Sequence, residues 1–482
     1  MNHPTVFSRR AFLRRAAILG GTIGGLGTLG LFAGSRPAQA AQYQALVCIY
    51  LSGGNDGLNM VVPSDAAGYA KYAAVRKTLA LPQSALIALG SGLNFGLHPA
   101  MSALQGVVTA GHLAPVFNLG TLAVPLTKAD YLAARPGDGR LPDSLYSHSD
   151  QAIEWQAASS HSIVSTGWGG RAVDTLSLGT PVVSVAGNGQ FGLSAKGSPL
   201  VLPATPGNSF GLSGLSSKDV TNASSPAATR KAALDALYAE AQTQTLATAY
   251  ASEQTAAVAI SESLAPYIAM KPDSTGNTAA TAAIDTAFKS LITGTSLSTG
   301  LARQLYQIAK LINVHATLGS TQQIYFAEMG GFDTHADQVS GGPASGNHAN
   351  LLKELADAMA AFQAAMNNLS LGSQVTVFTE SDFGRTFAIN QTSGTDHAWG
   401  NTHLVMGGAV KGGVTYGSFP DLTLGGPDDV GTTGNSQGRW IPTSSVDQYA
   451  ATLLAWLGAS SPQLDQILPN LAQYGTRNLG FV

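Results

Sequence analysis

Residues 324–379 contain two strand-like runs separated by a helical one: IYFAE at Ile324–Glu328, a helical stretch at Asn350–Leu369, and VTVFT at Val375–Thr379. In the helical stretch, apolar residues recur every three or four positions, at Leu352, Leu355, Met359, Phe362, Met366 and Leu369. The flanking runs are short and apolar, as buried parallel strands are. A strand–helix–strand unit of this kind predicts a parallel sheet covered by helices on both faces.

Further apolar runs of strand length lie on both sides of this unit. They span Leu46–Leu51, Pro115–Leu119, Pro181–Val185 and His403–Met406. Near the carboxyl terminus, Asp447–Leu457 (DQYAATLLAWL) reads as a helix packed on the sheet. Together these patterns predict an α/β fold, with a parallel sheet in an α/β/α sandwich.

The segment from about 204 to 300 differs in composition from the rest of the chain. It is rich in Ala, Ser and Thr, has Pro and Gly at both ends, and contains a helical core at Ala227–Met270. We interpret it as a mostly helical insertion or cap within an α/β domain of residues 41–482, with a flexible linker as the alternative.

The first 40 residues resemble an export signal. Arg9 and Arg10 precede an uncharged, glycine-rich stretch at Ala16–Gly34, and Ala38-Gln39-Ala40 is a small-x-small cleavage site. The pattern resembles a twin-arginine signal, which implies recognition by the twin-arginine export machinery and a periplasmic or secreted protein cleaved near Ala40. The apolar stretch of about 19 residues leaves a membrane anchor as the alternative, but its glycines disfavour a spanning helix.

The composition is low in charge. Only 11% of the 482 residues are charged, with 25 Lys and Arg against 28 Asp and Glu. Removal of residues 1–40 takes away five arginines and no acidic residue, so the net charge changes from −3 to −8. Without a basic excess we expect no nucleic-acid partner. The single cysteine excludes an internal disulfide, and no second apolar run is long enough to give a stable membrane span after cleavage.

Acidic loops follow three of the predicted strands. Strand LVCIYL leads to Asp56, strand IYFAE leads to Asp333 and His335, and strand VTVFT leads to Asp382. Ligands of open α/β sheets bind beyond the carboxyl ends of the strands, so we expect these side chains to lie at one edge.

A fourth loop carries Asp396 and His397 shortly before the strand that begins at His403. Carboxylates and imidazoles in this combination suit Zn²⁺, Mn²⁺ or Mg²⁺. The four loops therefore predict a divalent metal site, with enough ligands for a metal pair.

Each of these residues also has a purely structural interpretation. A carboxylate after a strand often caps a helix or fixes a turn, which for Asp56 is as reasonable as metal binding. Asp396 could orient His397 as a surface imidazole, and Glu380 could pair with Arg385. In a chain so poor in charge, four such loops at one sheet edge nevertheless favour a site.

Short motifs are spread over most of the chain, from about Leu46 to Tyr416. They are SHSDQ (147–151), STGWGGR (165–171), GGFDTH (330–335), VTVFTESDFGRT (375–386), GTDHAWGN (394–401) and GGAVKGG (407–413). In these motifs the chain resembles the exported bacterial family called domain of unknown function 1501. That family is similar to the alkaline phosphatase and sulfatase superfamily, which implies an alkaline-phosphatase-like fold and metal ligands on loops at one sheet edge.

The resemblance assigns a role to each predicted ligand. Asp56 would be the metal aspartate after the first strand, and Asp333 and His335 would form an Asp/His ligand pair. The late histidine ligand would be His397, with Asp396. Asp382 would belong to an Asp-His pair in which Phe383 replaces the histidine.

The same resemblance implies a nucleophile at the start of a helix. Ser147, before the helical stretch Asp150–Ala158, is the best candidate, with His148 and Ser149 beside it. The alternative is a simple N-cap serine. Arg385 would offset negative charge on the phosphoryl or sulfuryl oxygens.

Two functions from different classes follow from these patterns. The first is an exported metal-dependent hydrolase that acts on small anionic esters of phosphate or sulfate. The second is a non-catalytic binding or assembly protein of the cell envelope on a degenerate hydrolase scaffold, which Phe383 and the weakly defined nucleophile favour. A third hypothesis is recognition of a surface polymer by the helical insertion.

Overall fold

The structure is a computed structural model of this chain. It describes residues 42–482, apart from 136, 138, 162, 209, 212–214, 216–219, 221, 241–243, 274–279 and 318. The expected export signal, residues 1–40, lies outside the described residues. The described part forms a larger compact unit of residues 43–206, 271–313 and 322–482, and a smaller one that includes residues 207–270 and 314–321.

The larger unit is built on a sheet of nine strands in the described part of the chain. Their order is β13-β5-β12-β11-β1-β10-β6-β7, and β14 also pairs with β5. Their bounds are β1 Gln44–Leu51, β5 Leu113–Gly120, β6 Val183–Ser184, β7 Leu200–Val201, β10 Gln322–Met329, β11 Val375–Ser381, β12 Asn401–Met406, β13 Tyr416–Gly417 and β14 Ser444–Ser445. The strands predicted from the apolar runs are all present.

The sheet is mixed and mostly parallel, whereas the sequence predicted a parallel one. β12 runs antiparallel to both of its neighbours, β11 and β5. The connection from β11 to β12, residues 382–400, is described throughout and contains no helix. β12 begins at the sheet edge at which β11 ends, so the chain returns through the sheet in the opposite direction.

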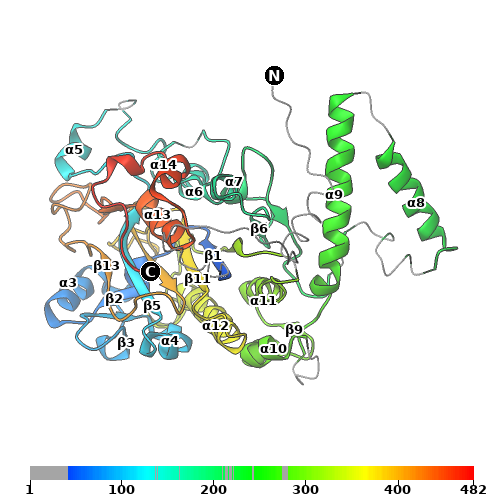
Figure 1. Cartoon of the computed structure of the whole chain (residues 1–482). Helices are drawn as coiled ribbons and strands as arrows, with labels where there is room; N and C mark the ends of the chain where they lie inside the picture. The colour runs from blue at the N-terminus through cyan, green and yellow to red at the C-terminus, as the bar shows by residue number, and fades with distance from the viewer. Residues whose placement is uncertain are drawn as a thin grey trace, which may run out of the picture. The chain divides into compact units, whose positions relative to one another are not determined.

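Thirteen α-helices lie in the described part. They are α2 Gly57–Met60, α3 Ala66–Arg76, α4 Gln105–Thr109, α5 Lys128–Ala133, α6 His148–Ala157, α7 Trp168–Leu176, α8 Pro226–Ala239, α9 Thr245–Ile268, α10 Ala282–Phe288, α11 Gly300–Asn313, α12 Asn347–Asn368, α13 Val446–Trp456 and α14 Ser461–Ile467. In the larger unit, α6, α7, α13 and α14 cover one face of the sheet, and α10, α11 and α12 cover the other (Figure 1).

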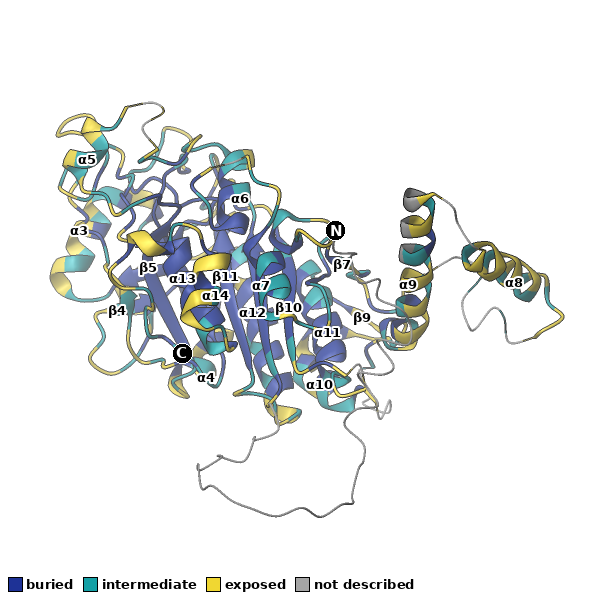
Figure 2. Cartoon of the chain, turned by 45° about the horizontal axis from the view of Figure 1, so that its top comes forward, coloured by how far each residue is buried: buried dark blue, intermediate teal, exposed yellow. Residues whose placement is uncertain are grey.

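Burial of the central strands accounts for this layered arrangement. Every residue of β1 after Gln44 is buried, as is all of β11. Between the sheet and the first helical layer, Cys48 and Phe378 pack with Trp155 and Trp168 in one hydrophobic core. Apolar strands buried on both faces need a helical layer on each side, and Figure 2 shows the buried strands between partly exposed helices.

The smaller unit contains the helical pair α8 and α9, which begins one residue before the predicted helical core Ala227–Met270 and ends inside it. Lys231 of α8 forms ion pairs with Asp235 on the same helix and with Glu262 of α9. Helix α10, from the later part of the expected insertion, belongs to the larger unit.

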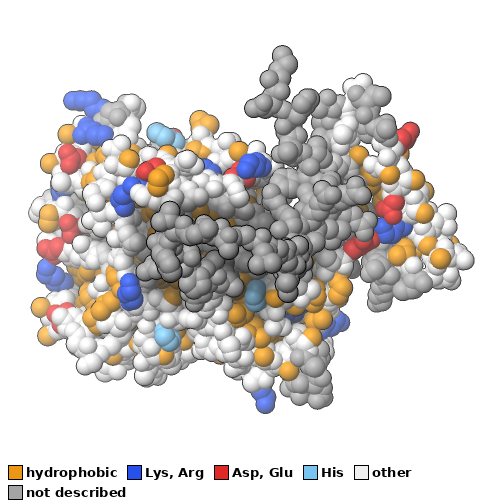
Figure 3. Space-filling view, in the orientation of Figure 1, with side chains coloured by type: hydrophobic (Ala, Val, Ile, Leu, Met, Phe, Trp, Pro, Cys, Tyr) orange, Lys and Arg blue, Asp and Glu red, His pale blue; other side chains and the backbone are white. Residues whose placement is uncertain are grey.

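The larger unit also contains two small antiparallel sheets. One consists of β2 Val61–Pro63, β3 Ile87–Ala88 and β4 Phe95–Leu97, and the other of β8 Ile292–Thr293 and β9 Ser296–Leu297. Among the described residues, no helix combines the length and the apolar character needed to cross a membrane. On the face drawn in Figure 3, charged side chains are few and scattered.

Candidate functional site

The carboxyl ends of several strands lie level at one edge of the sheet. Leu51 of β1 pairs with Met329 of β10 and with Ser381 of β11. At the same edge, Leu119 of β5 lies opposite Asn401, the first residue of β12. The loops after β1, β5, β10 and β11 therefore leave the sheet side by side.

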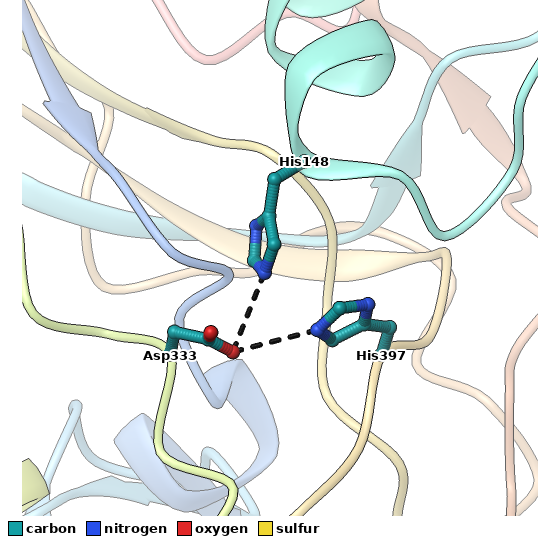
Figure 4. A group of neighbouring side chains, drawn as sticks. All are labelled: His148, Asp333 and His397. Atoms are coloured by element: carbon teal, nitrogen blue, oxygen red, sulfur yellow. Dashed lines mark ion pairs between the residues drawn. The ribbon is translucent and has the colours of Figure 1, made fainter.

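Three histidines surround one carboxylate oxygen of Asp333. Its Oδ1 atom lies 3.3 Å from His148 Nε2, 3.1 Å from His335 Nε2 and 3.4 Å from His397 Nε2. His335 Nε2 and His397 Nε2 are 2.7 Å apart. In Figure 4, His148 and His397 point at Asp333 from two sides. The four side chains converge although they come from α6, from the loop after β10 and from the loop before β12.

Each imidazole faces Asp333 with Nε2 and contacts a second partner through its Nδ1 atom. His148 Nδ1 lies 2.5 Å from Asp382 Oδ2, and His335 Nδ1 lies 3.1 Å from Asp396 Oδ1. His397 Nδ1 lies 2.8 Å from the carbonyl oxygen of Tyr146. All three partners can accept a hydrogen bond, so each Nδ1 is placed to carry a proton, and the neutral form of each ring would then present its lone pair at Nε2. Outer partners of this kind orient the histidine ligands of metal ions.

The donor set fits a single divalent cation. The ligand atoms of His148, Asp333 and His397 lie within 4.8 Å of one another. His148 Nε2 is buried and forms no hydrogen bond among the described residues. A buried nitrogen that makes no hydrogen bond is costly unless a cation or donor meets it. Imidazoles with one carboxylate suit Zn²⁺ or another transition metal better than Mg²⁺, which prefers oxygen ligands.

The local electrostatics favour the ligand form of Asp333 and of His397, whereas they favour the protonated form of His148 while no cation is bound. Burial acts to raise the pKa of Asp333, but the hydrogen bond and positive charge of Arg385 outweigh it and lower that pKa. Burial lowers the pKa of His397. The hydrogen bond with Asp382 raises the pKa of His148, against the opposing effect of burial. Asp333 is thus a carboxylate and His397 a neutral imidazole near neutral pH, as metal ligation requires.

Arg385 is a structural clamp of the site. Its side chain is fully buried and donates hydrogen bonds to Asp333, to the backbone oxygens of Gly53 and Gly54, and to that of Thr395. It therefore fixes three loops at once. The alternative pairing with Glu380 does not occur, because Glu380 accepts a hydrogen bond from Trp168 Nε1 at 3.0 Å.

Asp56, predicted as a metal ligand, does not join the cluster. Its carboxylate is fully buried and forms two hydrogen bonds with Arg76, at 2.5 and 2.9 Å. Gln338 Nε2 donates a third, at 2.6 Å. Because α3 brings a guanidinium to this carboxylate, its charge is already balanced. The metal assignment of Asp56 is corrected to a structural one.

Asp382 and Asp396, also predicted as ligands, lie behind the histidines. Asp382 accepts hydrogen bonds from Tyr50 Oη and Gly53 N as well as contacting His148. Asp396 accepts one from Asn390 Nδ2 at 3.0 Å and contacts His335. Each carboxylate meets Nδ1 of a histidine, and both Asp382 oxygens and Asp396 Oδ1 have these partners, so we correct both residues from ligands to outer carboxylates that orient a ligand.

Three further residues singled out in the sequence have defined places. The ring of Phe383 packs against His148 and His397, with centroid distances of 4.6 and 4.7 Å. Ser147 is the N-cap residue of α6, and its hydroxyl donates to Asp150 Oδ2. His403 is buried within β12, where burial lowers its pKa to about 3. Of these, Ser147 precedes a cluster histidine directly.

Sequence reasoning missed two parts of the site, His148 and Tyr146. His148 belongs to the SHSDQ motif, in which Ser147 was selected as the candidate nucleophile. The histidine at the start of the helix was the signal that could have identified a ligand. Tyr146 contributes a backbone oxygen from a strained conformation with a positive φ of 74°. Strain of this kind is concentrated at functional sites, but a main-chain contact leaves no mark on residue type.

Comparison with known proteins identifies the family of the chain but assigns it no activity. A comparison of the chain with curated proteins gives no match. The family profile described as "Protein of unknown function (DUF1501)" matches residues 43–429, which include all the histidines and carboxylates of the cluster. The chain therefore belongs to the DUF1501 family.

Proposed function

We propose that this chain is an exported, metal-dependent hydrolase of phosphate or sulfate esters. One observation carries the proposal: the Nε2 atoms of His148, His335 and His397 all lie within 3.4 Å of Asp333 Oδ1. Three imidazoles with fixed outer partners, meeting a carboxylate at the carboxyl edge of a sheet, form a preorganised cation site. Its exposed Asp333 leaves it accessible to a substrate.

The cation would be held by His148, His335, His397 and Asp333. A bound Zn²⁺ or Mn²⁺ ion would supply Lewis acidity toward an ester oxygen and toward the attacking hydroxyl or water. Asp382, Asp396 and the Tyr146 carbonyl would hold the imidazoles in place, and Phe383 would limit the movement of two of them.

Ser147 is the side chain best placed to act as a nucleophile. It directly precedes His148, and its hydroxyl already donates to Asp150, which can accept the proton as the oxygen attacks. Arg385 is fully buried and bound to Asp333, so we assign it a positioning role in place of direct contact with the substrate.

Export and the relationship to alkaline phosphatase and sulfatase are parts of this proposal. The twin-arginine pattern at Arg9 and Arg10 supports export in a folded, metal-loaded state, with cleavage near Ala40. The mostly parallel sheet with its site at the carboxyl edge supports the relationship. Amino-terminal sequencing of protein recovered from the periplasm tests the cleavage position.

The test of the hydrolase combines metal analysis with turnover. We expect protein isolated after native export to contain about one equivalent of a transition metal by mass spectrometry, and to hydrolyse 4-nitrophenyl phosphate or sulfate. A chelator should abolish turnover, and Asp333→Ala should lose both metal and turnover. A wild-type protein that contains no metal, or full activity in Asp333→Ala, would refute the proposal.

The second candidate is a non-catalytic envelope binding protein on the same scaffold. It is favoured by the partners of two arginines, because Arg76 pairs with Asp56, and Arg385 binds Asp333 and backbone oxygens. Neither is free to bind an anionic transition state. Metal-dependent turnover of an aryl ester that disappears in Asp333→Asn would decide against this candidate.

A further inference from the structure

A cavity of about 350 Å³ adjoins the histidine cluster. It lies between the loop after β10 and the first turns of α12, and Asp333 belongs both to the cluster and to the cavity wall. Its volume falls at the lower end of the range of small-molecule sites, about 300–1,000 Å³. An ester whose anionic group sits at the cluster would therefore place its alcohol part in this cavity.

The wall of the cavity is polar but contains no cation. Asn347 and Asn350 of α12 supply amide groups, and Glu354 supplies a carboxylate; the described residues of the wall include no Lys or Arg. Each amide both donates and accepts hydrogen bonds, as hydroxyl groups do. A second phosphate or sulfate would face the negative charges of Glu354 and Asp333, so this space disfavours another anion.

The cavity also lacks the surfaces that an aryl or lipid group would need. Among the residues that line it, Leu351 and Ala336 are the apolar side chains, and no aromatic ring is present. Stacking of an aryl group and burial of an alkyl chain are therefore both poorly supported. A compact, neutral, hydroxyl-rich group is the remaining class that fits.

The carboxylate in this wall is held in position by the fold. Glu354 Oε1 accepts a hydrogen bond from the backbone N–H of Leu301, at the start of α11, at 3.0 Å. Thr334 is anchored in turn, because its hydroxyl donates to Gln338 Oε1 at 3.1 Å. Fixed acceptors and exposed amides form a preorganised surface for hydroxyl groups.

We propose that the alcohol part of the substrate is a carbohydrate, so that the enzyme acts on sugar monoesters with one phosphate or sulfate group. This inference rests on the proposed function, since it places the ester group at the histidine cluster. Asn350 and Glu354 would bind sugar hydroxyls, while hydrolysis replaces the sugar O–P or O–S bond by a bond from the attacking oxygen and returns a proton to the sugar oxygen.

The test compares sugar and aryl esters in the exported, metal-loaded protein. Probes are the 6-phosphates and 6-sulfates of glucose, galactose, mannose and N-acetylglucosamine, with 4-nitrophenyl phosphate and sulfate as references. We expect at least one sugar ester to be preferred, and Asn350→Leu to lower the ratio of its kcat/KM to that of the aryl ester about tenfold. Lys353→Leu is the control, because Lys353 lies on α12 but is exposed and does not line the cavity. This variant should leave the ratio unchanged.

The outcomes separate this inference from the proposed function. Hydrolysis of aryl esters without any sugar ester, or an unchanged ratio in Asn350→Leu, would overturn the sugar assignment and leave the hydrolase intact. If no ester is hydrolysed, saturation-transfer NMR with the methyl glycosides of the same four sugars decides. A signal that weakens in Asn350→Leu but not in Lys353→Leu supports a carbohydrate site, and no signal in the wild type rejects it.

Discussion

Asp56 and Asp333 follow neighbouring parallel strands at the same sheet edge, yet their side chains differ in burial and in partners. The Asp56 side chain is fully buried and its charge is balanced by Arg76 of α3. The Asp333 side chain is 47% exposed and meets three imidazoles as well as Arg385. The first carboxylate has all its partners within the protein, whereas the second lies among nitrogen atoms that a cation would satisfy.

This difference shows that the position after a strand does not by itself define a ligand. Burial without a partner would make either carboxylate costly, and the fold resolves that cost in two ways. One carboxylate receives a guanidinium, which stabilises the loop. The other receives the Arg385 guanidinium together with three imidazoles, and a neutral imidazole can bind a cation.

The largest expected effect is on stability, from Asp56→Ala. Removal of one partner of a buried ion pair leaves the Arg76 charge uncompensated, so we expect the free energy of unfolding to fall by about 3–5 kcal/mol in urea titrations. Asp421→Ala is the matched control, because Asp421 pairs with Lys71 on the same helix but at the surface. That variant should lose at most about 1 kcal/mol. Equal losses in the two variants would contradict the structural role of Asp56.

His335→Ala should act on metal binding and leave the fold intact. We expect metal affinity and ester turnover to fall more than about 100-fold, because a direct ligand is lost. Stability of the metal-free protein should change by less than about 1 kcal/mol, as the side chain is partly exposed. His161→Ala, which removes an exposed histidine paired with Asp143, should change neither metal content nor turnover. A metal content that survives in His335→Ala would exclude this residue from the site.

Asp396→Asn tests the outer partners of the cluster. The amide can no longer hold His335 Nδ1 with a negative charge, so we expect metal affinity to fall about 10–100-fold in competition with a chromogenic chelator. Asp465→Asn, at the exposed pair with Arg477, is the control and should leave affinity unchanged. Wild-type affinity in Asp396→Asn would show that the His335–Asp396 contact does not tune the metal.

The last prediction concerns the pH dependence of stability and a buried carboxyl group, Glu154. Burial raises its pKa from 4.5 to about 8, despite hydrogen bonds from Gln151 Nε2 and Asp143 N. The folded state thus favours the protonated form. Its stabilising contribution is complete below the unfolded pKa and is lost as the pH rises toward about 8.

Urea unfolding at successive pH values from 5 to 8 tests whether the free energy of unfolding falls as the pH rises. We expect the free energy of unfolding to fall by at most about 1.4 kcal/mol per pH unit through Glu154, and Glu154→Gln to reduce the slope. Some slope should remain, because burial also raises the pKa of Asp447 to about 7. An identical slope in the variant would argue that Glu154 is ionised in the folded state.

The sequence predicted much of the fold because its signals are local. Apolar runs such as Leu46–Leu51 and the periodicity of Asn350–Leu369 reflect burial on one or two faces, and the structure confirms a strand and a helix there. Strand direction is not a local property. The antiparallel course of β12 follows from the helix-free connection 382–400, and no residue of His403–Met406 specifies it.

For the candidate site, the sequence determined which loops carry ligand chemistry, and the tertiary structure decided which side chains use it. Asp333, His335 and His397 could be named in advance, because carboxylates and imidazoles after strands gather at one edge. Arg76 could not be matched to Asp56, nor His148 to Asp333, because these partners are brought together by the packing of α3 and α6. Residue type and spacing define the available chemistry, but charge compensation depends on distances that only the folded chain sets.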